Sequence, residues 1–186
     1  QQERQQLQNM EAHARSHASD VDSAFQRFEG LLGVLVASSS EMISRKTVPD
    51  DKLYWVDDYD QDRVMNMVES KRFGYPVNLK HPSYTFPSKD VDRAVGMMHL
   101  TRLTPIRRHF KNVVVRSHSE AAAGFVPSRV KNRIAEQGTP ISWAYVGMKS
   151  GGYTIYPGHG GIPEAFDVRD RPWFKATSEP VSYTHL

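Results

Sequence analysis

Two arginines, two aspartates and three aromatic residues lie within one short segment near the C-terminal end of the sequence, from Phe166 to Ala176. Arginine binds carboxylate or phosphate oxygens through paired hydrogen bonds, and an aromatic ring can cover the apolar part of a ligand or a cation. Pro172 fixes the backbone immediately before Trp173. The segment therefore has the side chains for a pocket with a cationic floor and aromatic walls, suited to a small anion or zwitterion.

The same residues also have a purely structural interpretation. Acidic residues alternate with arginines, so that each guanidinium has an internal carboxylate partner: Asp167, Arg169, Asp170 and Arg171. In this interpretation the ion pairs and Pro172 rigidify a corner between a strand and a helix, and Trp173 fills the core. Both interpretations hold together if Asp167 and Arg169 support the fold while Arg171 and Trp173 face a ligand.

A predicted β-hairpin precedes this segment. Residues 141–148 alternate large and small side chains and are rich in strand formers, residues 149–152 read Lys-Ser-Gly-Gly, and residues 153–156 return as the second strand. The glycine-rich loop after the hairpin carries His159, which either contacts a ligand or merely occupies the loop. The hairpin would position the arginine-rich segment.

Residues 1–45 are predicted to form one long helix. Apolar or small residues recur in steps of three and four, and no proline interrupts them. The first twenty residues are too polar to bury much surface, so this part projects as a stalk or pairs with another copy. Between residues 25 and 36 the apolar stripe widens to include Leu32 and Val34, which favours packing onto a sheet.

The middle of the chain contains shorter predicted elements. Residues 46–90 are rich in turn signals, with a possible strand at 53–56 and a possible helix at 61–70. Ser88 is a plausible N-cap for a further helix that Pro105 kinks or restarts, residues 121–124 form a break, and residues 127–137 can hold another short helix.

Composition excludes several classes of function. The 186 residues suit one domain, and 24 basic residues are interspersed with 21 acidic ones for a net charge of +3, so nucleic-acid binding is not expected. The chain has no cysteine, which excludes thiol catalysis, disulfides and cysteine-based zinc sites. His13 and His17 have a zinc-compatible spacing but lack the glutamate of a His-Glu-x-x-His motif. No hydrolase nucleophile motif or phosphate-binding loop is present, so we expect binding without catalysis, and no cofactor or metal.

The two C-terminal motifs resemble a known family. Residues 145–158 read Tyr-Val-Gly-x-x-x-Gly-Gly-x-x-x-Tyr-Pro-Gly, and residues 166–174 read Phe-Asp-x-Arg-x-Arg-Pro-Trp-Phe. This combination is similar to the membrane-distal module of double Cache sensor domains. The resemblance implies an α+β fold: a PAS-like antiparallel sheet flanked by helices, built on a long N-terminal stalk helix. The expected organisation is a stalk at 1–45, a sensor domain at 46–181 that is incomplete at its C-terminus, and a possibly non-native tail at 182–186.

The resemblance also implies a function and a site. Cache domains form the extracytoplasmic, periplasmic or extracellular part of membrane-anchored receptors such as chemoreceptors and histidine kinases. We accordingly expect a homodimer through the N-terminal helix, with membrane contact only through anchors outside this chain. The ligand would be an amino acid, a small carboxylate or an amine. The amino-acid-binding branch of the family often has Tyr where this motif has its two Phe, so two hydroxyl groups are missing here. This weakens the case for an amino acid and leaves a small carboxylate or an amine open. The expected ligand contacts are Phe166, Arg171, Trp173 and Phe174 of the motif, together with Tyr145, Tyr156 and His159.

Two other functions remain open from the sequence. One is a protein-interaction or structural ectodomain with the Cache fold and no small ligand, as in the auxiliary α2δ subunits of calcium channels. The other is a hydrolase that depends on His159. The first predicts a copurifying partner protein, and the second predicts turnover of an ester or phosphate.

Overall fold

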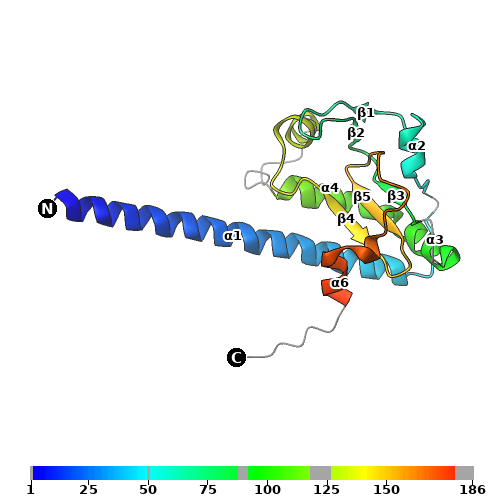
Figure 1. Cartoon of the computed structure of the whole chain (residues 1–186), viewed down its shortest axis with the longest axis horizontal. Coiled ribbons are helices and arrows are strands. Elements are labelled where there is room, and N and C mark those ends of the chain that lie inside the picture. Colours follow the sequence, from blue (N-terminus) through cyan, green and yellow to red (C-terminus); the bar gives the residue numbers. More distant parts are fainter. Residues whose placement is uncertain (1, 50, 88–91, 118–126, 179–186) are drawn as a thin grey trace.

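The computed structural model describes residues 2–49, 51–87, 92–117 and 127–178, which form an α+β fold. A long helix, α1 (Gln2–Ser44), extends well beyond a body in which small antiparallel sheets lie among shorter helices (Figure 1). The predicted α+β class and the predicted long N-terminal helix are confirmed. The tail at 182–186 lies outside the described residues.

Only the C-terminal part of α1 contributes to the core. Residues 4–23 are all exposed, whereas Leu35 and Met42 are buried. Their stripe packs mainly against the helices α3, η1 and α4, and Leu32 and Val34 stay about half exposed. The prediction that residues 25–36 pack onto a sheet is therefore wrong. The physical reason is that α4 packs against both the hairpin strands and α1, so helices provide the apolar surface that α1 covers.

Two helices and a 3₁₀ turn form the layer between α1 and the sheet: α3 (Arg93–Arg102), η1 (Thr104–Ile106) and α4 (Arg107–Arg116). The predicted restart at Pro105 is confirmed, because this residue lies in the first turn of η1, where its missing N–H costs nothing. Asp92 caps α3 by accepting a hydrogen bond from Val95 N at 3.1 Å. The predicted cap Ser88 and the predicted break at 121–124 lie outside the described residues.

Between α1 and α3, the described residues form one short helix, α2 (Val56–Asp60), and three short strands, β1 (Met67–Val68), β2 (Val77–Asn78) and β3 (Ser83–Thr85). The predicted helix at 61–70 is wrong, because Asp62 and Asn66 adopt positive φ angles of 53° and 63° that a right-handed helix cannot contain. The predicted strand at 53–56 reduces to one bridge between Trp55 and Tyr84.

The predicted C-terminal hairpin is confirmed as β4 (Ala144–Gly147) and β5 (Tyr153–Tyr156), and β5 lies between β3 and β4 in the three-stranded sheet. Before the hairpin, α5 (Pro127–Lys131) and the π-helical η3 (Asn132–Gln137) occupy the predicted helix at 127–137.

The register of the hairpin sorts its side chains onto two faces. Tyr145 pairs with Ile155, and Ala144 pairs with Tyr156. Because side chains alternate along a strand, Tyr145, Tyr153 and Ile155 share one face, and Ala144 and Tyr156 share the other. The second face packs against α4 in the main core, with the Tyr156 and Phe110 rings stacked at 6.4 Å. The first face, here called the outer face, receives the arginine-rich segment.

Among the described residues, none of the helices combines the length and the apolar character required to cross a bilayer.

Candidate ligand-binding surface and cavities

The arginine-rich segment folds as a short 3₁₀ turn, η4 (Val168–Asp170), followed by α6 (Pro172–Ser178). Asp167 begins the turn and accepts a hydrogen bond from Arg169 N at 2.9 Å. The same carboxylate also binds the Arg169 guanidinium in a two-pronged ion pair, with Nε 3.0 Å from both oxygens. The structural interpretation of the motif therefore describes this pair well. Val168, between its two members, is fully buried against Tyr153 and Ile155.

The Asp167–Arg169 pair should make stability depend on pH. Hydrogen bonds from Arg169 hold the pKa of the Asp167 carboxyl below its usual range. A carboxyl with a lowered pKa in the folded state stabilises the fold above its unfolded pKa of about 3.9, and this contribution is lost as the pH falls through the folded value. We expect Asp167→Asn to lower the free energy of unfolding near neutral pH, with a difference from wild type that shrinks below about pH 4. Denaturant titrations at several pH values measure it, and a difference that does not change with pH would contradict the pairing.

Arg171 lies differently from Arg169. Its side chain is exposed, and its guanidinium carbon is 4.4 Å from the centre of the Phe166 ring, a cation–π distance. Within the described part of the chain it forms no ion pair, and the neighbouring Asp170 lies 3.8 Å from the Lys175 ammonium. Its hydrogen-bonding edge therefore remains available to an external anion.

Trp173 packs on the outer face of the hairpin, two residues after Arg171 in the sequence. Its ring is 4.9 Å from Tyr145 and 5.9 Å from Phe174, and it is 37% exposed. Gly147 allows this approach, because a Cβ there would clash with Val168 Cγ2 and lie 3.2 Å from the Trp173 ring. Phe166 in turn packs on Tyr153 at 5.0 Å.

Four predicted ligand contacts thus lie along the outer face of the hairpin and the segment that covers it: Tyr145, Phe166, Arg171 and Trp173. We call these the arginine–aromatic surface. Phe174 adjoins it, partly buried against the same small cluster as Phe166. The surface offers one cationic fork and several ring faces, which is the chemistry of a site for a carboxylate with an apolar part.

Tyr156, the sixth predicted contact, lies elsewhere. It is fully buried on the α4 side of the sheet, where its hydroxyl donates to the Leu79 carbonyl at 3.0 Å and burial raises its pKa. A ligand on the outer face cannot reach it. Tyr145 and Tyr156 lie on opposite faces of the hairpin. The sequence alone does not show this, because the faces can be assigned only once the register of the two strands is known.

His159, the seventh, is buried in the loop after β5, with 9% of its surface exposed. Its ring lies 4.7 Å from Trp143 and 5.3 Å from Tyr75. Gly158 brings the loop against β2, because its backbone exchanges hydrogen bonds with Asn78 and a Cβ there would clash with Tyr59 and His81. His159 thus lies outside the arginine–aromatic surface, among the residues of a second cavity of about 680 Å³.

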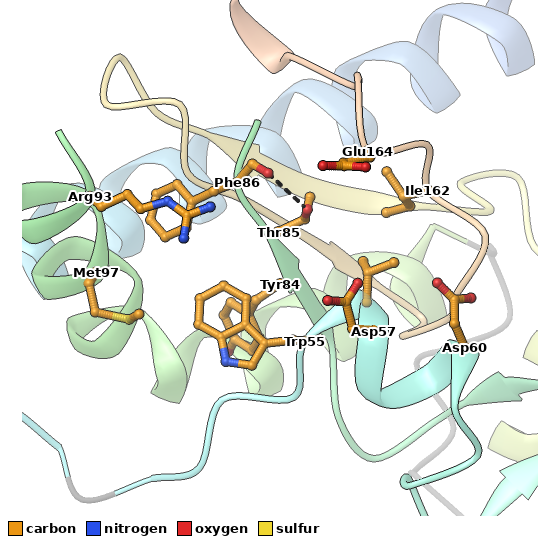
Figure 2. A pocket seen from close by; sticks show the side chains of 11 residues that line it. Trp55, Asp57, Asp60, Tyr84, Thr85, Phe86, Arg93, Met97, Ile162 and Glu164 are labelled. Carbon is orange, nitrogen blue, oxygen red and sulfur yellow. Dashed lines mark hydrogen bonds between the residues drawn. The ribbon is translucent and has the colours of Figure 1, made fainter. Parts of the chain in front are cut away.

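A cavity of about 720 Å³ that the sequence did not reveal lies between α2, β3, α3 and the loop at 162–164 (Figure 2). Trp55 contributes an aromatic wall, Arg93 lies on one side, and the carboxylates of Asp57, Asp60 and Glu164 lie across from it. The only feature of the sequence that points to this cavity is the pair of carboxylates, Asp57 and Asp60, on one short helix. Trp55 also packs internally, stacked on Phe86 at 5.9 Å.

Within the described ranges, no group of three or more His, Asp and Glu side chains is arranged to hold a metal ion. Comparisons of the chain with protein-family models, with curated proteins and with solved structures find no match.

Proposed function

We propose that the chain is the ligand-sensing region of a membrane-anchored receptor, of the Cache type, and that it binds a small carboxylate, amine or amino acid without catalysis. The proposal rests on one observation, that the side chains of Arg169 and Arg171 have different environments. Arg169 is held by Asp167, whereas Arg171 is exposed, without an ion pair in the described structure, and over the Phe166 ring. Trp173 packs on Tyr145 of the same outer face. Such an arginine can clasp a carboxylate while the indole covers the remainder of the ligand.

The packing supplies a continuous route from this surface to the long helix. Phe166 contacts Tyr153 on β5, and the opposite face of β5 stacks Tyr156 on Phe110 of α4. The core around Phe110 also includes Leu35 and Met42 of α1. A ligand that pulls the arginine-rich segment toward the sheet would bias how this layer packs on α1.

Polar contacts attach the same end of α1 to the helical layer. Ser38 Oγ lies 3.2 Å from His109 Nδ1, and the Arg102 guanidinium donates to the Ile43 carbonyl at 3.0 Å. A displacement of α3 or α4 would therefore be passed to α1 rather than absorbed. In the proposed receptor, α1 would transmit this displacement toward the membrane from an extracytoplasmic position, as one half of a homodimer.

A thermal-shift screen of small carboxylates, amines and amino acids against the chain tests the proposal. We expect one class of compound to raise the melting temperature, since a ligand at 100 times its Kd adds about 2.7 kcal/mol to the stability of the form that binds it. Folded protein that responds to none of these compounds would contradict small-molecule sensing and favour the interaction-ectodomain alternative.

A further inference from the structure

The strand β4 forms one edge of the three-stranded sheet, because β5 lies between β3 and β4 (Figure 1). No other strand of the described structure pairs with its outer side. Met148 N donates to the Gly152 carbonyl at 2.9 Å, so this facing pair is hydrogen-bonded. Bonded and non-bonded pairs alternate along an antiparallel ladder, so the register directs the N–H and C=O groups of Tyr145 and Gly147 away from β5. We call these groups the free edge of β4.

The free edge is open to a partner. The backbone groups of Tyr145 and Gly147 make no hydrogen bond in the described structure. The Tyr145 side chain is 38% exposed, and Val146 and Gly147 are partly exposed. The two outward-facing residues therefore present N–H donors and C=O acceptors to an incoming strand.

The opposite edge of the sheet, on β3, is protected. Tyr84 N donates to the Tyr54 carbonyl at 3.0 Å, and Pro82 and Pro87 flank the strand. Proteins commonly protect sheet edges with proline, charged side chains or a covering segment, because an unprotected edge is a template for pairing with another chain. β4 has the sequence Ala-Tyr-Val-Gly, with neither proline nor a charged residue. The unprotected strand is thus the one whose backbone groups are free.

The free edge is complementary to a second copy of itself. Its outward groups are placed symmetrically about Val146, one residue before it and one residue after it. In antiparallel pairing about a twofold axis at Val146, Tyr145 of each copy faces Gly147 of the other, and each facing pair exchanges two hydrogen bonds. β4 carries no charge, so no like charges come opposite each other. A second copy therefore satisfies every donor and acceptor of the free edge.

We propose that β4 is a self-association edge, at which two copies of this chain join their three-stranded sheets into one continuous sheet about a twofold axis at Val146. The interface lies on the hairpin and not on α1, through which the receptor dimer of the proposed function would form. It does not rest on that function, and the two can fail separately.

Disulfide cross-linking tests the proposed register, because the chain has no cysteine of its own. Val146→Cys would introduce one thiol at the twofold axis. The two copies of this residue would face each other as a non-hydrogen-bonded pair, with Cα atoms about 4.5 Å apart. A disulfide spans Cα distances of about 4.4–6.8 Å. We expect the full chain with Val146→Cys to form a covalent dimer on mild oxidation, seen on a non-reducing gel.

The matched control is Lys149→Cys, at an exposed position in the turn of the same hairpin. The proposed register places the two copies of residue 149 about 20 Å apart, so cross-linking should be slower by at least about tenfold although this side chain is more exposed. Val21→Cys reports separately on a dimer through α1, where residue 21 is 54% exposed. Equal rates at positions 146 and 149, or cross-linking at position 21 alone, would overturn the proposal.

Sedimentation velocity measures the affinity of the dimer. Tyr145→Pro removes an N–H that points away from β5 and leaves the hydrogen bonds of the hairpin intact, whereas Tyr145→Thr keeps the N–H and loses the same ring. We expect the proline variant to dimerise at least about tenfold more weakly than the threonine variant, since two hydrogen bonds between the copies are lost.

Urea titration checks that both variants fold, and the cross-linking result decides alone if the proline variant does not. Equal dimerisation of the two folded variants would overturn the proposal. A wild-type chain that stays monomeric at every concentration would also overturn it and would leave the free edge to a strand of another protein.

Discussion

Replacing Tyr156 by alanine is expected to lower the free energy of unfolding by about 3–5 kcal/mol, the usual cost of truncating a large buried aromatic side chain. The ring is fully buried, stacks on Phe110 and anchors its hydroxyl on the Leu79 carbonyl. Its removal would leave a cavity between β5 and α4, the two elements that connect the outer face to α1. Equilibrium denaturation with urea measures the effect.

Two companion variants separate packing from ligand contact at this position. Tyr156→Phe keeps the ring and loses one hydrogen bond, so it should cost only about 1 kcal/mol. Tyr145→Ala truncates the tyrosine on the opposite face of the same hairpin, where the side chain is 38% exposed, and should cost less than Tyr156→Ala. Wild-type stability in Tyr156→Ala would refute the placement of this residue in the core.

Arg171→Ala is expected to have the largest effect on ligand binding. Loss of a two-pronged, charge-assisted contact should weaken the affinity for a carboxylate ligand at least tenfold. The free energy of unfolding should fall by no more than about 1 kcal/mol, because the side chain is exposed, holds no ion pair in the described structure and loses only its cation–π contact with Phe166. Binding is measured by titration with the compound that the thermal-shift screen identifies.

Lys175→Ala is the matched control for this prediction. It removes a cation from α6, four residues after Arg171, where the ammonium makes only a long surface pair with Asp170 at 3.8 Å. Its affinity for the ligand should equal that of wild type. If Arg171→Ala instead unfolds the protein, the arginine is part of a structural corner. If Lys175→Ala weakens binding as much, the ligand responds only to the general charge of this region.

Local chemistry allowed much of the fold to be predicted. The period of two at 141–156, with Gly-Gly in the turn, predicted the hairpin, and the unbroken helical period predicted α1. The helix expected at 61–70 does not exist, because Asp62 and Asn66 adopt left-handed conformations, which Asp and Asn tolerate but which the residue pattern does not reveal. The packing partner of α1 could not be predicted from the sequence either, because an apolar stripe can pack on a helix as well as on a sheet.

The candidate sites show the same limit. The arginine–aromatic surface could be anticipated because its residues are close in sequence, and the Asp167–Arg169 pair is two residues apart. Asp60, Glu69 and His159 are distant in the sequence but line one cavity, next to the Asn78–Gly158 backbone bridge. Such a bridge depends on the approach of two backbones, which residue types alone do not specify.

The most direct test of the central claim is an NMR titration of the indole N–H signals of the three tryptophans with the ligand found in the screen. Trp173 lies on the arginine–aromatic surface, whereas Trp55 packs with Tyr84 and Phe86 and serves as an internal control. We expect the Trp173 signal, assigned by Trp173→Phe, to shift with the same Kd as binding, and the Trp55 signal to stay unchanged. Saturating ligand that moves the Trp55 signal and leaves Trp173 unchanged would contradict it.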